Sequence, residues 1–486
     1  MVRVQTQKFR QGSSRALHDK SIQRALSRVM PHFQDGRRAA IEEITPDVWE
    51  RLREKARDIK THTIANLDYY LDLLDQSVRS AGGHMHFAKD ANEANEIVLS
   101  IARQHNVKLV AKTKSMVSEE MGINEVFAQA GIESVETDLG EFIIQLAQEA
   151  PFHIIAPVMH KSKEQVSDIF VEKLHSQRHE EIQALCQEAR TQLRDKFLRA
   201  DMGMTGANIV VAQSGTVMLV TNEGNGRMCT SLPKVHVAVA GMEKLVPSLV
   251  DLSVFIRLLP RSATGQRITS YMTFITGPRR SSDEDGPEEF HLIVLDNGRS
   301  RLLKDPDLRD ALNCIRCGAC LNACPVFGKV GGHAYGWVYS GPIGAVVTPT
   351  LVGLNKSKDL PHASTLCGAC RDVCPVKINI PHMLLKLRMK SVSGNPKTER
   401  KVSRVERWLI RMWHRAVRSP ANFHRSWVLA SMLQRPFMKN GYLRRVPFPP
   451  FSRWNRQRDF PGVASKSFHQ RWQDYLGQSD PPIENS

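Results

Sequence analysis

Seven of the nine cysteines in this chain of 486 residues lie within one short stretch, and their spacing constrains the fold more than any other feature. The first four follow the pattern Cys314-x2-Cys317-x2-Cys320-x3-Cys324 and end on a proline. In such a run three thiolates wrap one corner of a cubane iron–sulfur cluster, while the fourth, turned away by the proline, reaches a different cluster. A zinc site uses two separated cysteine pairs around one ion, and four cysteines this close would crowd it. The spacing therefore predicts iron–sulfur chemistry.

The second motif, Cys367-x2-Cys370-x3-Cys374 followed by proline, has only three cysteines, and Ser364 stands where a fourth would be expected. Crossed ligation predicts one cluster with four thiolates and one with three. The three-thiolate cluster is then either [4Fe–4S], with water, serine or an external group on its fourth iron, or [3Fe–4S]. A hydroxyl is a poor iron ligand beside thiolates, so Ser364 is interpreted chiefly as a loop residue. The predicted ligands of cluster one are Cys314, Cys317, Cys320 and Cys374, and those of cluster two are Cys324, Cys367 and Cys370.

Other features of the sequence indicate the cellular compartment of the protein. No run of 18 apolar residues occurs, and the N-terminal segment lacks the apolar core of a secretory signal. Cysteines clustered in a long chain of this kind favour metal binding over a disulfide framework. We expect a cytoplasmic protein, with an arginine- and serine-containing transit peptide as the alternative interpretation of the N-terminus. Cys186 and Cys229 are interpreted as small buried or half-buried residues, and His333 as a packed or surface histidine.

The pattern of apolar and polar residues changes along the chain and predicts four regions. Apolar residues at helical spacing mark the N-terminal region. Short apolar strands such as "VKLVAK" and "KVHVAVAG" then alternate with helical stretches, which is typical of an α/β domain with a largely parallel sheet. The closer spacing of the later strands predicts an antiparallel part. The predicted regions are a helical segment at 1–70, an α/β domain at 71–300, an iron–sulfur domain at 301–390, and a basic, tryptophan-rich region at 391–486.

The net charge of +17 comes almost wholly from the C-terminal end. From residue 381 onward there are 21 Lys and Arg against 6 Asp and Glu. Arginines and an apolar stripe at helical spacing predict a basic amphipathic helix, able to lie on an anionic membrane or in a partner's groove. Packing of the stripe on the iron–sulfur domain is an equally open alternative, and we expect no nucleic-acid binding because no such module is recognisable. The basic face is Arg404, Arg407, Arg411, Arg415 and Arg418, and the apolar stripe is Val405, Trp408, Leu409, Met412 and Ala416.

Three stretches together resemble the lactate utilization protein B family: the cysteine run, "YGWVYSGPIGAVVTP" behind it, and "TGANIVVAQSGTVMLVTNEGNGRMCTSLPKVHVAVAGMEKLVPSL" upstream. The resemblance covers nearly the whole chain and implies a LUD domain, a ferredoxin-like domain of the α-helical type and a basic C-terminal region. It implies an iron–sulfur subunit that carries electrons in the oxidation of L-lactate to pyruvate, with a cysteine-rich partner and a second LUD-domain partner. The second motif of that family also has three cysteines.

The implied LUD domain is similar to the sugar-phosphate isomerase and CoA-transferase superfamily, in which loops after strands hold acyl or phosphate groups. Glycine loops at 204–208, 213–216 and 221–227 are the candidates here, because backbone N–H groups in such loops can hold an anion. Glycines of ordinary turns are the alternative interpretation. Glu223 is a candidate nucleophile or base by analogy with CoA transferases, and His236 is interpreted as a packing residue. The candidate anion-binding residues are Gly206, Gly215, Thr216, Gly224, Gly226 and Arg227.

Three functional hypotheses follow. An electron-transfer subunit would pass electrons from L-lactate oxidation through two clusters to a quinone-side acceptor, as a cytoplasmic protein associated peripherally with the inner face of the membrane. Alternatively, the chain is a dehydrogenase in its own right, whose LUD domain binds a 2-hydroxy or amino acid and whose clusters relay the electrons. A scaffold with redox-inert clusters is the third hypothesis. The sequence has no Rossmann glycine fingerprint and no flavin signature, so it does not indicate which group accepts the hydride.

Overall fold

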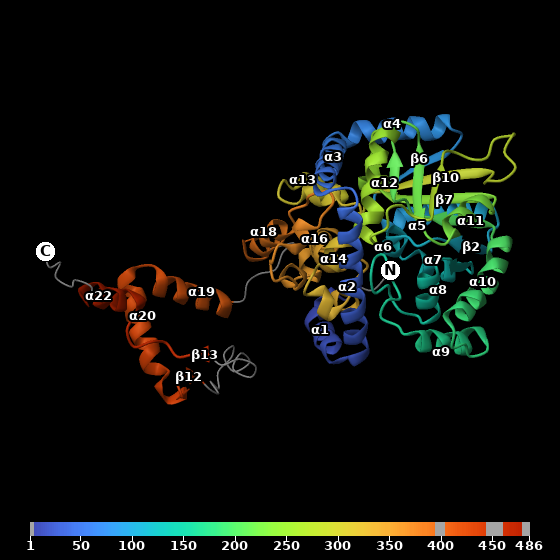
Figure 1. The fold of residues 1–486 in the computed structure, drawn as a ribbon. Helices are drawn as coiled ribbons and strands as arrows, with labels where there is room; N and C mark the ends of the chain where they lie inside the picture. Colours follow the sequence, from blue (N-terminus) through green and yellow to red (C-terminus); the bar gives the residue numbers. More distant parts are fainter. Residues whose placement is uncertain (1–3, 394–403, 444–459, 479–486) are drawn as a thin grey trace. The chain divides into compact units, whose positions relative to one another are not determined.

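The computed structural model describes residues 4–393, 404–443 and 460–478 (Figure 1). The chain divides into two compact units, Met1–Arg400 and Lys401–Ser486, which are described separately. Among the described residues no helix combines the length and the apolar character needed to cross a membrane.

Four α-helices precede the first strand. Asp19 begins the long second helix by accepting two backbone N–H groups, and Pro46 occupies the first turn of the third, where its missing N–H costs nothing. Leu26 and Trp49 are buried in the same apolar core as the cysteine loops. These helices therefore help to enclose the cysteine region. Their bounds are η1 (Thr6–Lys8), α1 (Phe9–His18), α2 (Lys20–Glu42), α3 (Pro46–Ala65) and α4 (Leu67–Ser80).

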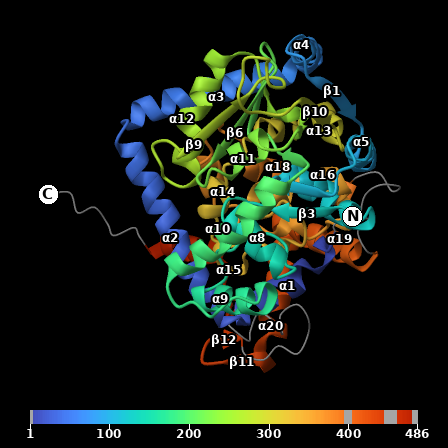
Figure 2. The ribbon, with the colours of Figure 1, turned by 90° about the vertical axis from the view of Figure 1, so that its right-hand side faces the viewer.

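Six parallel strands form the main sheet, in the order β1-β10-β7-β4-β2-β3 (Figures 1 and 2). The central strand β7 is buried along its whole length, as expected for a strand covered on both faces. This sheet confirms the predicted, largely parallel α/β architecture. Its strands are β1 (His84–Ala88), β2 (Leu109–Lys112), β3 (Glu133–Glu136), β4 (Met202–Thr205), β7 (Val235–Gly241) and β10 (Glu289–Leu295).

Helices cover both faces of the main sheet. Three of them, α5 to α7, pack on one face. On the other face α8 to α10 lie against β2 and β3, and α4 lies against β10. Because the sheet is enclosed, ligands reach it only through the loops at the strand ends. The bounds are α5 (Ala91–Gln104), α6 (Met116–Met121), α7 (Ile123–Gln129), α8 (Leu139–Leu146), α9 (Lys163–Leu174), α10 (Ile182–Arg199) and α11 (Asn225–Ser231).

A second, smaller sheet has the order β8-β5-β6-β9. Two of its three pairings, β5 with β6 and β6 with β9, are antiparallel, and the third is parallel. The close spacing of the later strands predicted antiparallel pairing within part of the same sheet, whereas the structure places the antiparallel pairs in this separate sheet. Its elements are β5 (Ile209–Val211), β6 (Thr216–Thr221), η2 (Met242–Lys244), β8 (Leu245–Val246) and β9 (Tyr271–Ile275), and helix α12 (Leu249–Ala263) follows β8.

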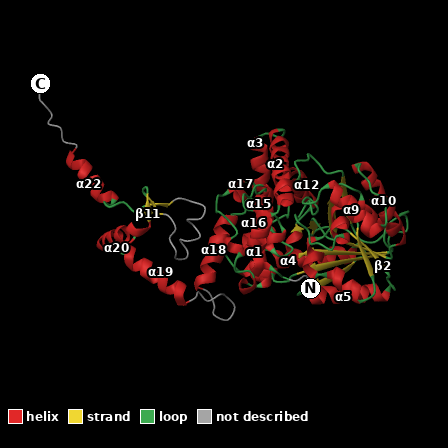
Figure 3. Ribbon diagram, turned by 90° about the horizontal axis from the view of Figure 1, so that it is seen from below, coloured by secondary structure: helices red, strands yellow, loops and turns green. Residues whose placement is uncertain are grey.

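The cysteine region, residues 299–393, contains helices and loops and no strand (Figure 3). Its core is continuous with that of α1 to α3 and α12. The long apolar helix α16 lies at the centre and is buried on nearly all sides. The bounds are α13 (Arg299–Lys304), η3 (Arg309–Asn313), α14 (Ala319–Asn322), α15 (Phe327–Val330), η4 (His333–Tyr335), α16 (Gly341–Val352), η5 (Leu354–Lys356), η6 (Leu360–His362), α17 (Ala369–Asp372) and α18 (Ile380–Ser393).

The C-terminal unit begins with a helix, α19, over the segment where the basic amphipathic helix is predicted. Trp408 and Leu409 of its apolar stripe are both more than half exposed. Further along, the Trp427 indole N–H donates to the carbonyl of Ala464, while Trp454 lies outside the described residues. The bounds are α19 (Arg404–Val417), α20 (Pro420–Leu433), η7 (Arg435–Phe437), β11 (Met438–Lys439), β12 (Tyr442–Leu443), β13 (Phe460–Pro461) and α22 (Phe468–Gln478).

Candidate functional site

The two cysteine motifs share one backbone design. Arg316 and Gly318 have positive φ angles of 59° and 77° in the first motif, and Leu366 and Gly368 have 57° and 90° at the equivalent positions of the second. The glycine accepts this left-handed conformation without strain and begins the short helix, α14 or α17, that carries the next cysteine. The two motifs are therefore structural repeats.

This repeat places Ser364 in the position of Cys314. The Cys314 sulfur accepts the N–H of Arg316 at 3.4 Å, and the Ser364 hydroxyl accepts the N–H of Leu366 at 3.0 Å. The serine thus makes the same local turn contact as the cysteine it replaces. It is half-buried.

The seven cysteines fall into two neighbouring groups, which we call the first set and the second set. In the first set, the pKa of Cys320 is raised well above its usual value by burial and by three neighbouring thiolates. In the second set, burial and two neighbouring thiolates raise the pKa of Cys370 to about 12. The first set is Cys314, Cys317, Cys320 and Cys374, and the second is Cys324, Cys367 and Cys370.

The two sets differ in exposure. Three members of the first set are buried and Cys314 is half-buried, whereas Cys367 of the second set is exposed. All nine cysteines are free thiols. Buried thiols with raised pKa values lose their protons chiefly to a bound metal. The first set is thus enclosed, and the second opens toward solvent.

The sulfur spacing argues against a single ion. Within the described parts of the chain, no three cysteine sulfurs lie within 4.8 Å of one another. Tetrahedral zinc with bonds of about 2.3 Å would bring its sulfurs to within roughly 3.8 Å. A cubane cluster holds its thiolates farther apart because each binds a different iron.

Other groups around the sulfurs fit iron–sulfur clusters. Backbone N–H groups of Phe327 and Ile378 donate to the sulfurs of Cys324 and Cys374 at 3.4 and 3.3 Å. Tyr335 is fully buried, and its hydroxyl has no hydrogen-bond partner among the described residues. Burial and then the charges of cysteines from both sets raise the pKa of Tyr335, so this hydroxyl lies near both sets. N–H and O–H donors of this kind stabilise the negative charge of clusters.

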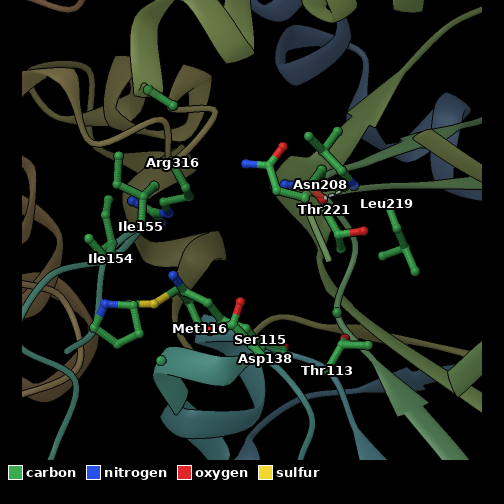
Figure 4. A pocket seen from close by; sticks show the side chains of 18 of the residues that line it. Thr113, Ser115, Met116, Asp138, Ile154, Ile155, Asn208, Leu219, Thr221 and Arg316 are labelled. Carbon is green, nitrogen blue, oxygen red and sulfur yellow. Dashed lines mark hydrogen bonds between the residues drawn. The ribbon is translucent and has the colours of Figure 1, made fainter. Parts of the chain in front are cut away.

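Beside the first set lies a cavity of about 460 Å³ (Figure 4). Its floor is formed by loops that follow β2, β3 and β4, which is the edge where open parallel sheets bind ligands. Arg316 and Tyr339 of the cysteine region complete the wall, so two parts of the fold build one cavity. Figure 4 shows Arg316 on one side of the space and Asn208 and Thr221 on the other.

Three residues that line this cavity each have a buried polar atom without a hydrogen-bond partner in the described structure: Arg316 Nη1, Thr221 Oγ1 and Asn225 Oδ1. Lys244, also a lining residue, is 8% exposed. Because these three atoms have almost no accessible surface, they lie within the wall of the cavity and do not face its open space.

A buried ionic network joins the cavity to the α/β part. Arg316 Nη2 lies 3.3 Å from Glu243 Oε1, and Arg299 Nε lies 2.6 Å from Glu243 Oε2. Arg299 also donates two bonds of 2.9 Å to Glu120, which accepts a third, 2.6 Å long, from the Tyr339 hydroxyl. Burial alone would raise the pKa of Glu243, but Arg299 and Arg316 lower it to about 2. The network therefore stays ionised and fixes the position of Arg316.

Only some of the predicted anion-binding residues reach the cavity. Gly206 lines it, and so does Glu223, whose carboxylate accepts the Leu139 N–H at 2.9 Å. Burial and the nearby Asp138 raise the pKa of Glu223. Glu223 thus lies at the exposed rim of the cavity, beside a second carboxylate.

The other predicted loop residues lie elsewhere. Gly215, with a φ of 65°, packs against Ser77 and Val78 of α4, and the Thr216 hydroxyl bonds those of Ser214 and Thr276. The structure therefore does not bring the three glycine loops together into one cradle.

The last of these loops leads into helix α11. Gly224, with a φ of 73°, precedes this helix, and Gly226 packs on Thr221. The Arg227 side chain is 63% exposed and lies 3.8 Å from Asp285, outside the cavity lining. The guanidinium that lines the cavity is that of Arg316, which the sequence did not predict as a site residue.

The remaining candidates do not line this cavity. His236 is buried and bonds the Thr205 hydroxyl at 2.9 Å, and Cys229 is buried against Thr137. Cys186 is exposed. The exposed ring of His333 donates to the carbonyl of Ala150.

Comparison with known proteins gives two family models that match this chain. One, the LUD domain, covers residues 71–295. The other, the 4Fe-4S dicluster domain, covers residues 310–378 and includes all seven clustered cysteines. The chain thus contains both domains.

Curated relatives match almost the full length. Lactate utilization protein B of Bacillus velezensis is 42% identical over 97% of this chain and 98% of its own. The protein of the same name from Macrococcus caseolyticus is 43% identical over 98% of this chain and 98% of its own. That from Bacillus subtilis is 41% identical over 97% of this chain and 97% of its own. A crystal structure of a DUF162 family protein from Deinococcus radiodurans covers 47% of this chain and 98% of its own at 14% identity, with a TM-score of 0.27.

Proposed function

This chain belongs to the lactate utilization protein B family, and from that premise we propose that it is an iron–sulfur electron-transfer subunit acting in the oxidation of L-lactate to pyruvate. The observation that carries the proposal is the convergence of seven free thiols into two neighbouring sets beside a cavity.

The first set would hold a [4Fe–4S] cluster with four thiolates, and the second set a cluster with three. Bound clusters supply one-electron transfer. The chain itself encloses the first set and directs backbone N–H groups at the sulfurs. It also keeps the Tyr335 hydroxyl near both sets, available as a donor to either cluster.

The second cluster would be [4Fe–4S] with an open fourth iron, or [3Fe–4S]. Ser364 occupies the place of the missing thiolate and accepts the equivalent backbone N–H, but a hydroxyl is a poor iron ligand beside thiolates. The exposure of Cys367 leaves this side of the cluster accessible to a partner or an external ligand.

Low-temperature EPR with iron counting tests this proposal on anaerobically purified protein, before and after dithionite. A three-iron signal in the untreated sample with about seven irons would assign [4Fe–4S] plus [3Fe–4S]. About eight irons, a silent starting spectrum and interacting signals after reduction would assign two [4Fe–4S] clusters. Clusters that no reductant changes would overturn the electron-transfer function and leave a scaffold.

The cavity favours one alternative, a dehydrogenase in its own right. In that case the LUD domain would bind a 2-hydroxy or amino acid and the clusters would relay its electrons internally. Lactate-dependent reduction of the isolated chain would support the dehydrogenase, whereas reduction only with added partner subunits would support the relay. We further propose that the LUD domain, residues 71–300, keeps the strand-end ligand loops of the sugar-phosphate isomerase and CoA-transferase superfamily.

The partners that we propose are cysteine-rich and LUD-domain subunits of a lactate-utilization complex, with a quinone-side acceptor at the inner face of the membrane. The exposed apolar stripe and arginines of α19 support peripheral binding to an anionic bilayer from the cytoplasm. Sedimentation with anionic and neutral vesicles tests this, since α19 should favour the anionic ones. Replacement of Trp408 by Ala should weaken the binding.

A further inference from the structure

We propose that the edge of the main sheet where β1 and β10 begin holds a site for a divalent transition metal of the zinc class, with His84, Glu289 and His291 as its ligands. One nitrogen of each histidine and one carboxylate oxygen of Glu289 lie within 4.8 Å of one another. The cavity lies at the opposite edge of the sheet, where the strands end. This site is therefore separate from the cavity and independent of the electron-transfer function.

Strand pairing brings the three ligands together. His84 pairs with His291 across the parallel strands β1 and β10, and Glu289 stands two residues before His291. Because side chains alternate between the two faces of a strand, all three project from the same face. That face is covered by α5, which contacts both strands (Figure 2).

The spacing suits a metal with nitrogen and oxygen ligands. His291 Nε2 lies 3.3 Å from Glu289 Oε2. Tetrahedral zinc with bonds of about 2.0 Å holds its ligand atoms roughly 3.3 Å apart. The His84 and His291 rings are stacked with centroids 4.7 Å apart, and His84 is exposed, so its ring can rotate to complete the coordination. A set of two imidazoles and one carboxylate suits zinc and its neighbours, whereas calcium and magnesium prefer oxygen ligands alone.

Two further histidines orient the less exposed ligands. His86 Nε2 lies 3.1 Å from His291 Nδ1, and His105 Nε2 lies 3.1 Å from Glu289 Oε2. When the Nδ1–H of His291 is donated to His86, the Nε2 of His291 is free to bind a metal. Partners of this kind fix the tautomer and direction of a ligand and strengthen metal binding. The cluster thus supplies both the ligands and the groups that hold them.

The surroundings admit a dication. Helix α5 ends beside His105, and the negative end of a helix dipole favours a cation. Arg79, which donates to the backbone of β1, is itself paired with Asp75 at 2.9 Å. His291 is buried and His84 is exposed, so the site is open to solvent on one side. That opening provides an entry path for the metal and a position for a bound water.

Such a metal would fasten the outermost strand of the sheet. β1 stands at the end of the strand order and is bonded to β10. His84 belongs to β1, whereas Glu289 and His291 belong to β10, so a shared ion would cross-link the two strands. Because the unfolded chain does not hold these residues together, binding would stabilise the folded state. Without a metal the same residues would form only a hydrogen-bonded cluster around Glu289.

Equilibrium dialysis of the anaerobic, cluster-loaded full chain against Zn²⁺, followed by metal analysis, tests the site. We expect a single zinc for each chain in addition to the iron, and no comparable uptake of Mg²⁺. His86→Phe, which removes an orienting partner, should weaken zinc binding about tenfold, and His84→Ala, which removes an exposed ligand, should weaken it more. His32→Ala replaces an exposed histidine of α2 and is the matched control, with unchanged affinity.

Zinc X-ray absorption separates this site from the cysteines. We expect nitrogen and oxygen ligands at about 2.0 Å and no sulfur at about 2.3 Å. Zinc should also raise the unfolding temperature of the wild type and of His32→Ala but not that of His84→Ala. If His84→Ala does not fold, Glu289→Gln, which keeps the shape of the side chain, provides the same comparison. Sulfur ligands, no zinc on the wild type, or unchanged zinc binding in these ligand variants would overturn the site and leave a hydrogen-bonded cluster.

Discussion

The two cysteine motifs have the same backbone and different surroundings. Arg316 of the first corresponds to Leu366 of the second, and both residues have φ near 60°. Cys314 likewise corresponds to Ser364, with equivalent contacts to the backbone. The first motif thus has four thiols in its set and a neighbouring cation, whereas the second has three thiols, of which Cys367 is exposed, and an apolar residue in place of the cation.

This difference shows that two copies of a repeat can take distinct roles while keeping the same backbone. The copies differ in the solvent exposure of their cysteines and in the charge of a neighbouring residue. The first set adjoins the cavity and the buried network of Glu243 through Arg316. The second set, open at Cys367, is arranged for exchange with a partner. The following predictions test this contrast.

Loss of one thiol should be far more damaging in the first set. Cys320→Ser should remove about half of the iron and also destabilise the shared core, because Cys320 is buried beside α14 and α16. Cys367→Ser removes an exposed thiol and should lower the iron content while the fold is retained. Iron analysis with thermal unfolding of both variants measures the contrast. Equal loss of unfolding temperature in the two would contradict it.

The buried ionic network beside the first set should contribute far more to stability than a surface ion pair. Glu243→Gln leaves Arg299 and Arg316 buried without their shared carboxylate, which should cost about 3–5 kcal/mol of unfolding free energy. The surface pair of Lys377 and Glu54, which is more exposed, should contribute less than about 1 kcal/mol when Lys377 is changed to Ala. Denaturant unfolding of the cluster-loaded protein compares the two. A small effect of Glu243→Gln would show that the network relaxes easily.

Much of the architecture was predictable because its signals are local. Cysteine spacing predicted the grouping of thiols, and runs such as "KVHVAVAG" predicted buried parallel strands. Helical periodicity in the N-terminal region predicted its helices but not the surface on which they pack. In the structure they pack against the cysteine region. The spacing of apolar residues shows which face of a helix is buried, but it does not show which other part of the chain packs against that face.

The candidate site was less predictable because it is assembled from distant parts of the chain. Glu120, Glu243 and Arg316 meet only after folding, and no spacing rule relates them. The sequence suggested Arg227 as an anion ligand because it follows a glycine loop, but its side chain is exposed. Arg316 was not identified as a candidate because it lies between two cysteines of the cluster motif. A charged residue at positive φ inside a cysteine motif is a signal that only the backbone reveals.

Exchange of the residues that differ should shift the reduction potentials in opposite directions. Arg316→Leu removes a cation near the first set and should lower its potential, by about 2 kcal/mol or roughly 90 mV for one charge some 8 Å away in a partly buried site. Leu366→Arg should raise the potential of the second set by less, since solvent screens charges there. Redox titration followed by EPR measures both. Potentials unchanged in Arg316→Leu would mean that Arg316 does not tune the first set.

The smallest change, Ser364→Cys, restores the missing thiol of the repeat. Because Ser364 already makes the turn contact of Cys314, a cysteine there should direct its sulfur at the second cluster without moving the backbone. If the native cluster is [3Fe–4S], iron should rise from about seven to about eight and the three-iron signal should disappear. If it is an open [4Fe–4S] cluster, iron should stay constant while exogenous ligands such as cyanide cease to alter its EPR spectrum.

Thr365→Cys, one residue along the same loop, is the matched control for this last prediction, since its side chain is exposed and should leave the iron content and spectrum unchanged. A Ser364→Cys protein that keeps both its three-iron signal and its response to cyanide would show that the two motifs differ in more than one ligand. The equivalence of Ser364 and Cys314 would then be limited to the backbone. The open face of the second cluster would have to be attributed to the shape of its loop.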